Sequence, residues 1–223
     1  MNTDLNEYRE PNTYNEAIRN SDKMLWKKAM DSEMNSLKEN KTWVLVDLPK
    51  NRKAIPCKWV FRIKLNSDGS VEKYKARLVI KGFSQKKGID YDQTFSPVAK
   101  SGTIRAVLSV AASEGLSLLQ FDVTTAFLNS SIDEEIFMKQ PEGYNDGSGR
   151  VCLLRRSLYG LKQAPRCWNR CIADVLKEIG FRQSDADACL FIKERRDSKL
   201  MLVLNEFIDE LKLKFKINTK PTT

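Results

Sequence analysis

The stretch WVFRIKLNSDGSVEKYKARLVI, residues 59–80, carries the clearest structural pattern of the chain. Apolar and polar side chains alternate on both sides of NSDG (66–69), whose residue types are typical of a tight turn. A period of two places every second residue on the same face of a strand. The pattern therefore predicts a β-hairpin, and its apolar face would consist of Trp59, Phe61, Ile63, Leu65, Tyr74, Ala76, Leu78 and Ile80.

The other face of the predicted hairpin is strongly basic. Its five cations are Arg62, Lys64, Lys73, Lys75 and Arg77. Like charges on neighbouring strands repel each other, and a bound phosphate would relieve that repulsion. The alternative is an exposed sheet face whose charges only keep a strand edge soluble.

The composition favours a polyanionic partner and excludes several kinds of catalysis. The 223 residues include 38 Lys and Arg against 29 Asp and Glu, and residues 49–87 alone hold twelve of the cations and two of the acids. A formal net charge of +9 with this distribution favours nucleic acid as a partner. Because the chain has no histidine, it cannot use a histidine general base, a Ser-His-Asp or Cys-His nucleophile, or a histidine-ligated zinc or haem.

Several features predict an intracellular protein, cytoplasmic or nuclear, without a membrane segment. No apolar run approaches the ~20 residues of a membrane helix, and MNTDLNEYRE at the N-terminus lacks the pattern of a secretory signal. The cysteines form neither a CxxC pair nor a zinc-binding set, so we expect reduced and mostly buried thiols. They are Cys57, Cys152, Cys167, Cys171 and Cys189.

Local patterns elsewhere predict an α+β fold without internal repeats. Thr13 and Glu16 form a capping box that opens a helical stretch, in one or two pieces, reaching Leu37. Further helices are expected from about Ile104 to Gly115 and from Pro165 to Gly180, short strands at 118–123, 189–192 and 200–204, a turn-rich loop at 140–150, and helical spacing at 205–217.

Asp122 is an acid at the end of the otherwise apolar segment LLQFDV (118–123). A carboxylate on a buried strand must be paired, protonated or bound to a metal ion. A metal-binding role is therefore one interpretation of Asp122. A helix-capping or salt-bridged role is the other.

Taken together and in order, these segments closely resemble the reverse transcriptase of copia-type LTR retrotransposons. The match runs from about Glu10 to Leu204, and such a long ordered set is far more specific than one short motif. The segments are EPNTYNEAI (10–18), WKKAMDSEMNSLKENKTWVLVDLP (26–49), CKWVFRIK (57–64), DGSVEKYKARLVIKGFSQKKGIDYDQTFSPVAK (68–100), TIRAVLSVAA (103–112), QFDVTTAFLN (120–129), EEIFMKQPEGY (134–144) and SLYGLKQAPRCW (157–168).

The resemblance implies part of a right-hand polymerase, with fingers and a palm built on an antiparallel sheet with packed helices. It implies a helical lead-in at 1–40, fingers and palm at 41–204, and a truncated helix and tail at 205–223, with the thumb absent. The implied activity is RNA-directed DNA synthesis with Mg²⁺. The implied partners are an RNA or DNA template–primer and deoxynucleoside triphosphates.

The resemblance also implies roles for residues of the palm strand. Asp122 matches the aspartate that binds both catalytic Mg²⁺ ions, and the backbone carbonyl of Val123 would be a further ligand. Phe127 matches the bulky residue beneath the sugar that rejects a 2′-hydroxyl, although core packing is an alternative role for it.

In the fingers, Lys75 and Arg77 match the contacts to the triphosphate, and the register leaves open which of them is the principal one. Arg62, Lys64 and Lys73 would bind nucleic acid. Within SLYGLKQAPRCW, which lies between template and nucleotide in the family, Gly160 would let the backbone approach the base. Lys162, Gln163 and Pro165 would shape the turn and the start of the helix, and Lys162 and Gln163 are counted with the nucleotide site.

The chain departs from the family at one decisive place. Relatives carry Tyr-Val-Asp-Asp in a palm hairpin directly after an apolar strand like KLMLVL, whereas here Leu204 runs straight into NEFIDE (205–210). No adjacent Asp-Asp pair occurs anywhere in the sequence. An internal deletion accounts for this, so we expect no polymerase activity, unpaired palm strands and exposed apolar surface.

Three functions follow as hypotheses. The first is a working RNA-directed DNA polymerase. The second, which the missing aspartate pair favours, is an inactive relic or truncated product that binds nucleic acid through the basic hairpin. The third is a repurposed nucleic-acid-binding or protein-interaction module without polymerase activity. As a pure protein-interaction module, it would keep its function after neutralisation of the five hairpin cations.

Overall fold

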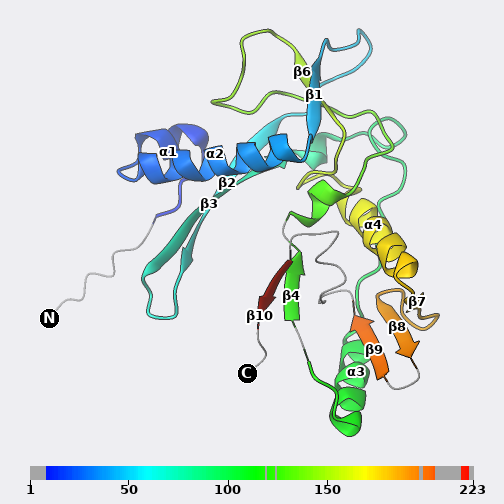
Figure 1. Cartoon of the computed structure of the whole chain (residues 1–223). Coiled ribbons are helices and arrows are strands. Elements are labelled where there is room, and N and C mark those ends of the chain that lie inside the picture. The colour runs from blue at the N-terminus through cyan, green and yellow to red at the C-terminus, as the bar shows by residue number, and fades with distance from the viewer. Residues whose placement is uncertain (1–8, 119, 124, 196–197, 204–216, 221–223) are drawn as a thin grey trace, which may run out of the picture. The chain divides into compact units, whose positions relative to one another are not determined.

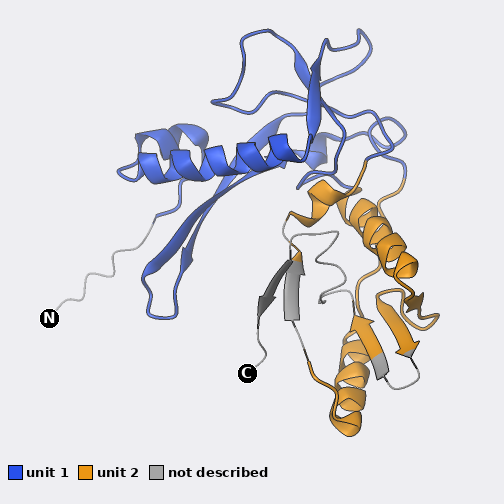
Figure 2. Ribbon diagram, viewed as in Figure 1, with its two compact units in different colours: residues 1–92, 132–162 blue, residues 93–131, 163–223 orange. Residues whose placement is uncertain are grey.

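The computed structural model describes residues 9–118, 120–123, 125–195, 198–203 and 217–220. The chain divides into two compact units, each assembled from two separate segments (Figure 2). Unit 1 comprises residues 1–92 and 132–162, and unit 2 comprises residues 93–131 and 163–223. The named strands pair antiparallel in both units and helices accompany them, so the fold is of mixed α and β type.

Two helices open the described part of unit 1 (Figure 1). α1 (Tyr14–Arg19) begins after Thr13, whose hydroxyl accepts a hydrogen bond from the Glu16 amide at 3.1 Å. The Glu16 carboxylate accepts a hydrogen bond from the Asn12 amide at 2.9 Å, one residue before the position expected for a capping box. α2 (Lys23–Glu39) follows, which confirms the predicted helical stretch in two pieces.

The predicted hairpin is confirmed. β2 (Cys57–Leu65) pairs with β3 (Val71–Ile80) across the turn that contains residues 66–69. In this register Arg62 lies opposite Lys75, and Lys64 lies opposite Lys73. The apolar face is the covered one, since its residues Trp59, Phe61, Ala76, Leu78 and Ile80 are buried.

Trp26 of α2 fixes the helix on the apolar face of the hairpin. Its fully buried ring meets Phe61 and Tyr74 edge to face, with ring centroids 5.2 and 4.7 Å apart. The Glu33 carboxylate, also on α2, accepts a hydrogen bond from the Leu78 amide at 3.2 Å. Helix α2 thus covers both the apolar face and part of the outer edge of β3, a way of protecting an edge strand.

A second sheet of unit 1 has the order β1-β6-β5. Its strands are β1 (Trp43–Val46), β6 (Val151–Leu154) and β5 (Phe137–Met138). Ala54, Phe137 and Val151 form a small buried cluster beside it. The sequence did not predict this sheet, because strands of two to four residues are too short to show a period and the paired strands are far apart in the chain.

The described part of unit 2 includes the helices α3 and α4 and a three-stranded sheet. α3 (Ser101–Glu114) ends at Gly115, which adopts a φ of 64°, and α4 (Ala164–Glu178) has a proline in its first turn. β7 (Arg182–Gln183), β8 (Leu190–Arg195) and β9 (Ser198–Val203) form a sheet in that order. These helices and the β8 and β9 strands agree with the sequence analysis.

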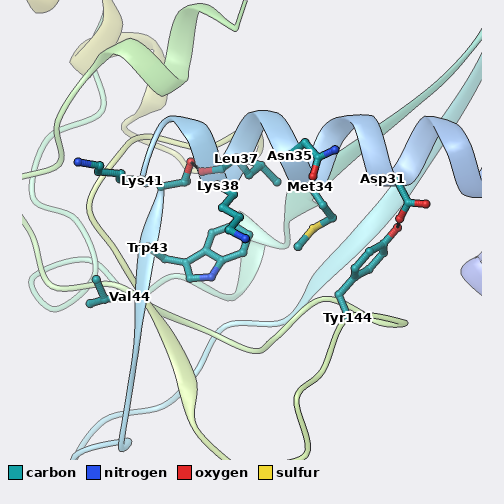
Figure 3. Close-up of a pocket in the computed structure, with 10 residues that line it drawn as sticks. Asp31, Met34, Asn35, Leu37, Lys38, Lys41, Trp43, Val44 and Tyr144 are labelled. Atoms are coloured by element: carbon teal, nitrogen blue, oxygen red, sulfur yellow. Dashed lines mark hydrogen bonds between the residues drawn. The ribbon is translucent and has the colours of Figure 1, made fainter.

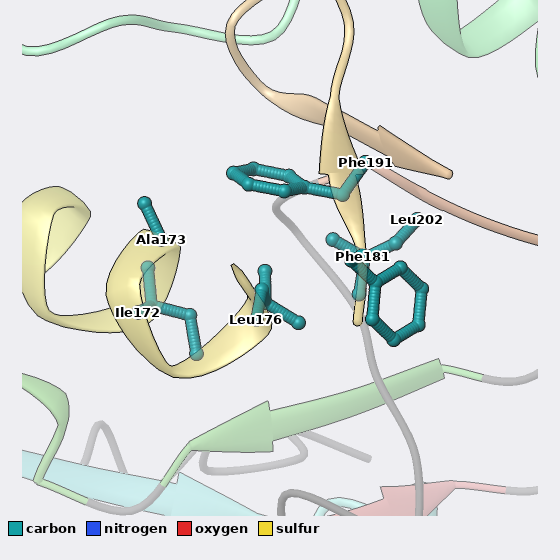
Figure 4. Packing of buried hydrophobic residues seen from close by; sticks show 6 residues of the cluster. All are labelled: Ile172, Ala173, Leu176, Phe181, Phe191 and Leu202. Atoms are coloured by element: carbon teal, nitrogen blue, oxygen red, sulfur yellow. The ribbon is translucent and has the colours of Figure 1, made fainter. Parts of the chain in front are cut away.

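The apolar core of unit 2 joins α4 to this sheet (Figure 4). Its members are Ile172, Ala173, Leu176, Phe181, Phe191 and Leu202. Val123 packs against the same cluster, which anchors the end of β4 (Gln120–Val123). The strand carrying Asp122 is thus tied to the core by the residue that follows the aspartate.

Strand β4 is paired, which corrects the expectation that the deletion leaves it without a partner. β10 (Ile217–Lys220) runs antiparallel to it, with Ile217 opposite Val123 and Asn218 opposite Asp122. The sequence analysis had extended helical spacing to residue 217, but Ile217 begins this strand. The helix expected over residues 205–216 lies outside the described residues.

The five cysteines are reduced, with Cys152, Cys167 and Cys189 buried and Cys57 and Cys171 half-buried, as expected. Burial raises the pKa of Cys57 to about 11 and that of Cys152 to about 12, so both thiols are protonated and unreactive at neutral pH. Within the described residues, no helix combines the length and the apolar character needed to cross a membrane.

Replacing Trp26 by alanine should destabilise the chain by about 3–5 kcal/mol, because the substitution leaves a cavity between α2 and the hairpin. Urea unfolding followed by circular dichroism measures this. Leu25→Ala is the matched control, since Leu25 is the preceding helical residue and is 45% exposed, and it should change the free energy of unfolding by less than about 0.5 kcal/mol. Equal losses for both variants would contradict the role given to Trp26.

Candidate functional site

The basic face of the hairpin is the first part of the candidate site. Lys64 and Lys73 are exposed and directly opposite each other, and none of the described carboxylates forms an ion pair with either. Lys75 is half-buried, and burial together with the charges of Arg77 and Lys64 lowers its pKa. A face with this excess of positive charge would gain from an anion bound across the two strands.

Arg62 differs from the other cations of this face because it already has an acidic partner. Its guanidinium forms an ion pair with the Glu10 carboxylate, which also accepts a hydrogen bond from the Ile63 amide at 2.8 Å. The charge of Arg62 is therefore balanced within the chain. No local pattern indicates this contact, since the two partners are 52 residues apart.

Arg77 points toward the second part of the site. Its guanidinium lies over the Tyr159 ring, 5.0 Å from the centroid, in a cation–π contact. Burial raises the pKa of Glu33, and the nearby charges of Arg77 and Lys75 oppose that shift. Arg77 is thus in contact with an aromatic ring, and its charge acts on a carboxylate of α2.

The turn that contains Tyr159 and Gly160 is docked directly on the hairpin. The Ile80 amide donates a hydrogen bond to the Tyr159 carbonyl at 2.9 Å. Gly160 has a φ of 95°, and a Cβ atom there would lie 2.1 Å from the Ile80 carbonyl oxygen. A Cβ on Gly82 would lie 1.9 Å from the Gly160 oxygen. Glycine is therefore required at both positions by backbone packing within the chain, whatever its role toward a base.

Lys162 and Gln163 are also used within the chain. The Lys162 amide donates to the Gln85 side chain at 2.8 Å, and its ammonium group bonds the Tyr91 hydroxyl at 3.2 Å. Gln163 is 1% exposed and caps the N-terminus of α4, where its carbonyl accepts a hydrogen bond from the Cys167 amide. These contacts agree with the expected shaping of the turn and the helix start, while a contact of either residue with nucleotide stays a prediction.

In unit 2 the backbone turns sharply after the strand that carries Asp122. Thr125 adopts a φ of 54°, which is strained for a β-branched residue, and its carbonyl accepts hydrogen bonds from the Leu128 amide and the Asn129 side chain. The short helix η2 (Ala126–Asn129) follows and contains Phe127, which is half-buried. The Asp122 side chain lies outside the described part of the chain.

The residues beside Asp122 do not supply a second carboxylate. Strand β10 contributes Asn218 opposite Asp122, with Ile217, Thr219 and Lys220 as its other members. Among the described side chains, no group of three or more Cys, Asp or Glu could hold a metal ion. The acids at 133–135 belong to unit 1, where Glu135 pairs with Arg52 at 3.6 Å, and Asp209 and Glu210 lie outside the described residues.

A cavity that the sequence did not predict lies between α2 and the start of β1 (Figure 3). Its volume is about 780 Å³. At its rim the Tyr144 hydroxyl donates to the Asp31 carboxylate at 2.6 Å, and the Lys27 ammonium group bonds the same carboxylate at 2.6 Å. The hydrogen bond from Lys27 lowers the pKa of Asp31, and burial raises that of Tyr144 to about 12. No local pattern indicates the cavity, because its walls come from segments about 100 residues apart.

Comparison with known proteins gives the class of this molecule. The model of the reverse transcriptase (RNA-dependent DNA polymerase) family matches residues 40–219, and the chain belongs to that family. Among its relatives are Pol polyproteins of copia-type plant retrotransposons, which agrees with the resemblance drawn from the sequence.

The chain spans only about a sixth or a seventh of the length of the Pol polyproteins it matches. The retrovirus-related Pol polyprotein from transposon TNT 1-94 of Nicotiana tabacum is 43% identical over 209 residues, which cover 93% of this chain and 16% of the relative. The retrovirus-related Pol polyprotein from transposon RE1 of Arabidopsis thaliana is 42% identical over 205 residues, which cover 91% of this chain and 14% of the relative. An uncharacterized mitochondrial protein of Arabidopsis thaliana is 51% identical over 86 residues, covering 39% of this chain and 51% of that protein.

Gly160→Ala should destabilise unit 1 through a backbone clash in addition to the strain of its positive φ. Gly180→Ala is the matched control, because Gly180 has a φ of 89° but its added Cβ would meet nothing closer than 3.7 Å. The alanine at 160 should therefore cost about 1–3 kcal/mol more free energy of unfolding than the alanine at 180. Chemical denaturation of both variants tests this, and equal costs would show that the close approach at Gly160 does not matter.

Proposed function

We propose that this chain is a fingers-and-palm segment of a copia-type reverse transcriptase that binds template–primer but does not extend it. Residues 41–204 would supply the fingers and palm, and residues 1–40 the helical lead-in. The observation that carries the proposal is the missing aspartate pair. Strand β9 ends at Val203, and the following LNEFIDE contains no adjacent Asp-Asp where the resembled family has Tyr-Val-Asp-Asp.

The loss of the aspartate pair removes negative charge that two bound metal ions would require. A two-metal site holds two Mg²⁺ ions ~3.5–4 Å apart, and several carboxylates are needed to balance four positive charges at that distance. Asp122 would be one ligand, with the Val123 carbonyl as a second oxygen. The strand beside them contributes Asn218 and Lys220, an amide and another cation. The one carboxylate among the residues of the paired strands β4 and β10 does not fit a two-metal site.

The binding part of the proposal rests on the hairpin. Lys64 and Lys73 are exposed and lack acidic partners among the described residues, while Lys75 and Arg77 are held nearer to the docked Tyr159–Gly160 turn. Contacts of this kind neutralise phosphates without reading bases. We expect sequence-independent affinity in the range of about 10⁻⁴–10⁻⁶ M at physiological salt.

Primer extension tests the inactivity directly. With an RNA template, a DNA primer, deoxynucleoside triphosphates and Mg²⁺, the purified chain should give no product above background, and Asp122→Asn should give the same result. A retroviral reverse transcriptase serves as the positive control for the substrates. Robust extension by the chain that disappears in Asp122→Asn would refute the proposed loss of activity.

Neutralising the exposed lysine pair should weaken binding uniformly across nucleic-acid sequences. For Lys64→Gln/Lys73→Gln, the slope of log affinity against log salt should become shallower by about 2, because each lysine releases about one counterion. Fluorescence anisotropy with a labelled RNA–DNA duplex measures it. Lys177→Gln/Arg182→Gln changes the net charge equally on exposed residues of unit 2 and is the matched control. Identical slopes for wild type and the hairpin variant would instead favour a protein-interaction module.

The gene itself distinguishes decay from a splicing product. If the genomic sequence between the codons for Leu204 and Asn205 encodes Tyr-Val-Asp-Asp, the chain derives from an intact element by removal of that stretch. If those codons are contiguous, the deletion is genuine.

A further inference from the structure

The turn at residues 81–87 presents an aromatic ring to solvent from a rigid base. Phe83 is 81% exposed, whereas its neighbours Gly82 and Gln85 are buried. Single exposed apolar residues are common on proteins and usually mean nothing. Phe83 differs because the backbone on both sides of it is fixed.

Gly82 is locked against Gly160, since no Cβ fits between them. The Ser84 and Gln85 amides donate to the Lys81 and Gly82 carbonyls at 2.9 and 3.0 Å, which closes the turn. The Gln85 side-chain oxygen then accepts a hydrogen bond from the Lys162 amide at 2.8 Å. The ring of Phe83 therefore projects from a braced turn, so little conformational entropy would be lost when a planar ligand stacks on it.

Three lysines lie within four residues of Phe83 in the chain, and a second aromatic residue belongs to the segment docked on this turn. Lys86 and Lys87 are exposed in the same turn, and Lys81 is half-exposed. Tyr159, with the Arg77 guanidinium over its face, directly precedes Gly160 and so lies one residue from the contact with Gly82. Of the two acids that follow in the chain, Asp90 is buried and its carboxylate accepts a hydrogen bond from the Lys86 amide at 2.8 Å, whereas Asp92 is exposed.

An exposed aromatic ring with three lysines within four residues of it in the chain has the composition of a stacking platform for unpaired bases. Bases of any sequence stack on aromatic rings, while lysines follow the phosphates. A duplex offers its phosphates but hides its base faces, so only a single strand can use both groups. We propose that Phe83, with Lys81, Lys86 and Lys87, binds single-stranded nucleic acid. The proposal deepens the proposed nucleic-acid role by naming a second subsite and its ligand.

The test compares single-stranded and duplex binding by fluorescence anisotropy. Phe83→Ala should weaken binding of a labelled twelve-residue oligouridylate about five- to hundredfold, and should leave an RNA–DNA duplex of the same length unaffected. Phe83→Leu should weaken binding similarly because it keeps an apolar side chain but removes the π face, whereas Phe83→Trp should retain affinity. Because the ring is exposed, these variants should fold normally, which thermal melting checks.

Phe95→Ala is the matched control, since Phe95 is 79% exposed but has Asp92 and no lysine or arginine within four residues. It should leave single-strand affinity unchanged. Unaltered affinity in Phe83→Ala would overturn the inference while leaving hairpin-mediated duplex binding intact. Full affinity in Phe83→Leu would overturn it too, in favour of a simple apolar contact. A wild-type chain that binds neither oligonucleotide would overturn both this inference and the proposed nucleic-acid role.

Discussion

The close approach of two backbone segments at Gly82 and Gly160 is the constraint on which the candidate interface depends. The segments are 78 residues apart in the chain, and they meet with no room for a Cβ atom on either side. The hydrogen bond from the Ile80 amide to the Tyr159 carbonyl continues the same junction. Because of it, the basic hairpin, the Phe83 turn and the SLYGLK segment (157–162) are joined within unit 1. A side chain at either glycine would separate the cations from the aromatic residues beside them.

The elements that the sequence predicted are those whose signals are local. The hairpin at 57–80 shows its period within a single stretch, Thr13 and Glu16 mark a helix start within four residues, and Gly115 marks a helix end. The β1-β6-β5 sheet and the β10–β4 pair escaped prediction because their strands have two to four residues and their partners are about 15–110 positions away. Such pairing is decided by tertiary packing, which leaves no trace in a short apolar run.

The candidate site shows the same limit at the level of single charges. Composition identified a basic face correctly, but it could not tell which cations are already used. Arg62 pairs with Glu10 and Lys162 bonds Tyr91, whereas Lys64 and Lys73 face each other without an acid among the described residues. An acid on an apolar strand indicated Asp122 before the resemblance implied its role, and only the register revealed that Asn218 stands across from it. Sequence motifs therefore predict which positions are functional, whereas the partners of those residues are known only from the folded structure.

The facing pair Lys64 and Lys73 gives the hairpin an unusual response to ionic strength. Directly opposite residues on antiparallel strands have Cβ atoms about 5 Å apart, a separation shorter than the Debye length of about 10 Å at 0.1 M salt but longer than that of about 3 Å at 1 M. Added salt therefore screens a repulsion here and tightens the outer half of the hairpin, while it weakens any grip of the same lysines on phosphate. The outer half of the hairpin therefore frays most readily at low salt. At high salt its strands pair more firmly, but phosphate binds to it more weakly. Either a bound phosphate or a high salt concentration therefore reduces the repulsion between Lys64 and Lys73 and favours the paired strands.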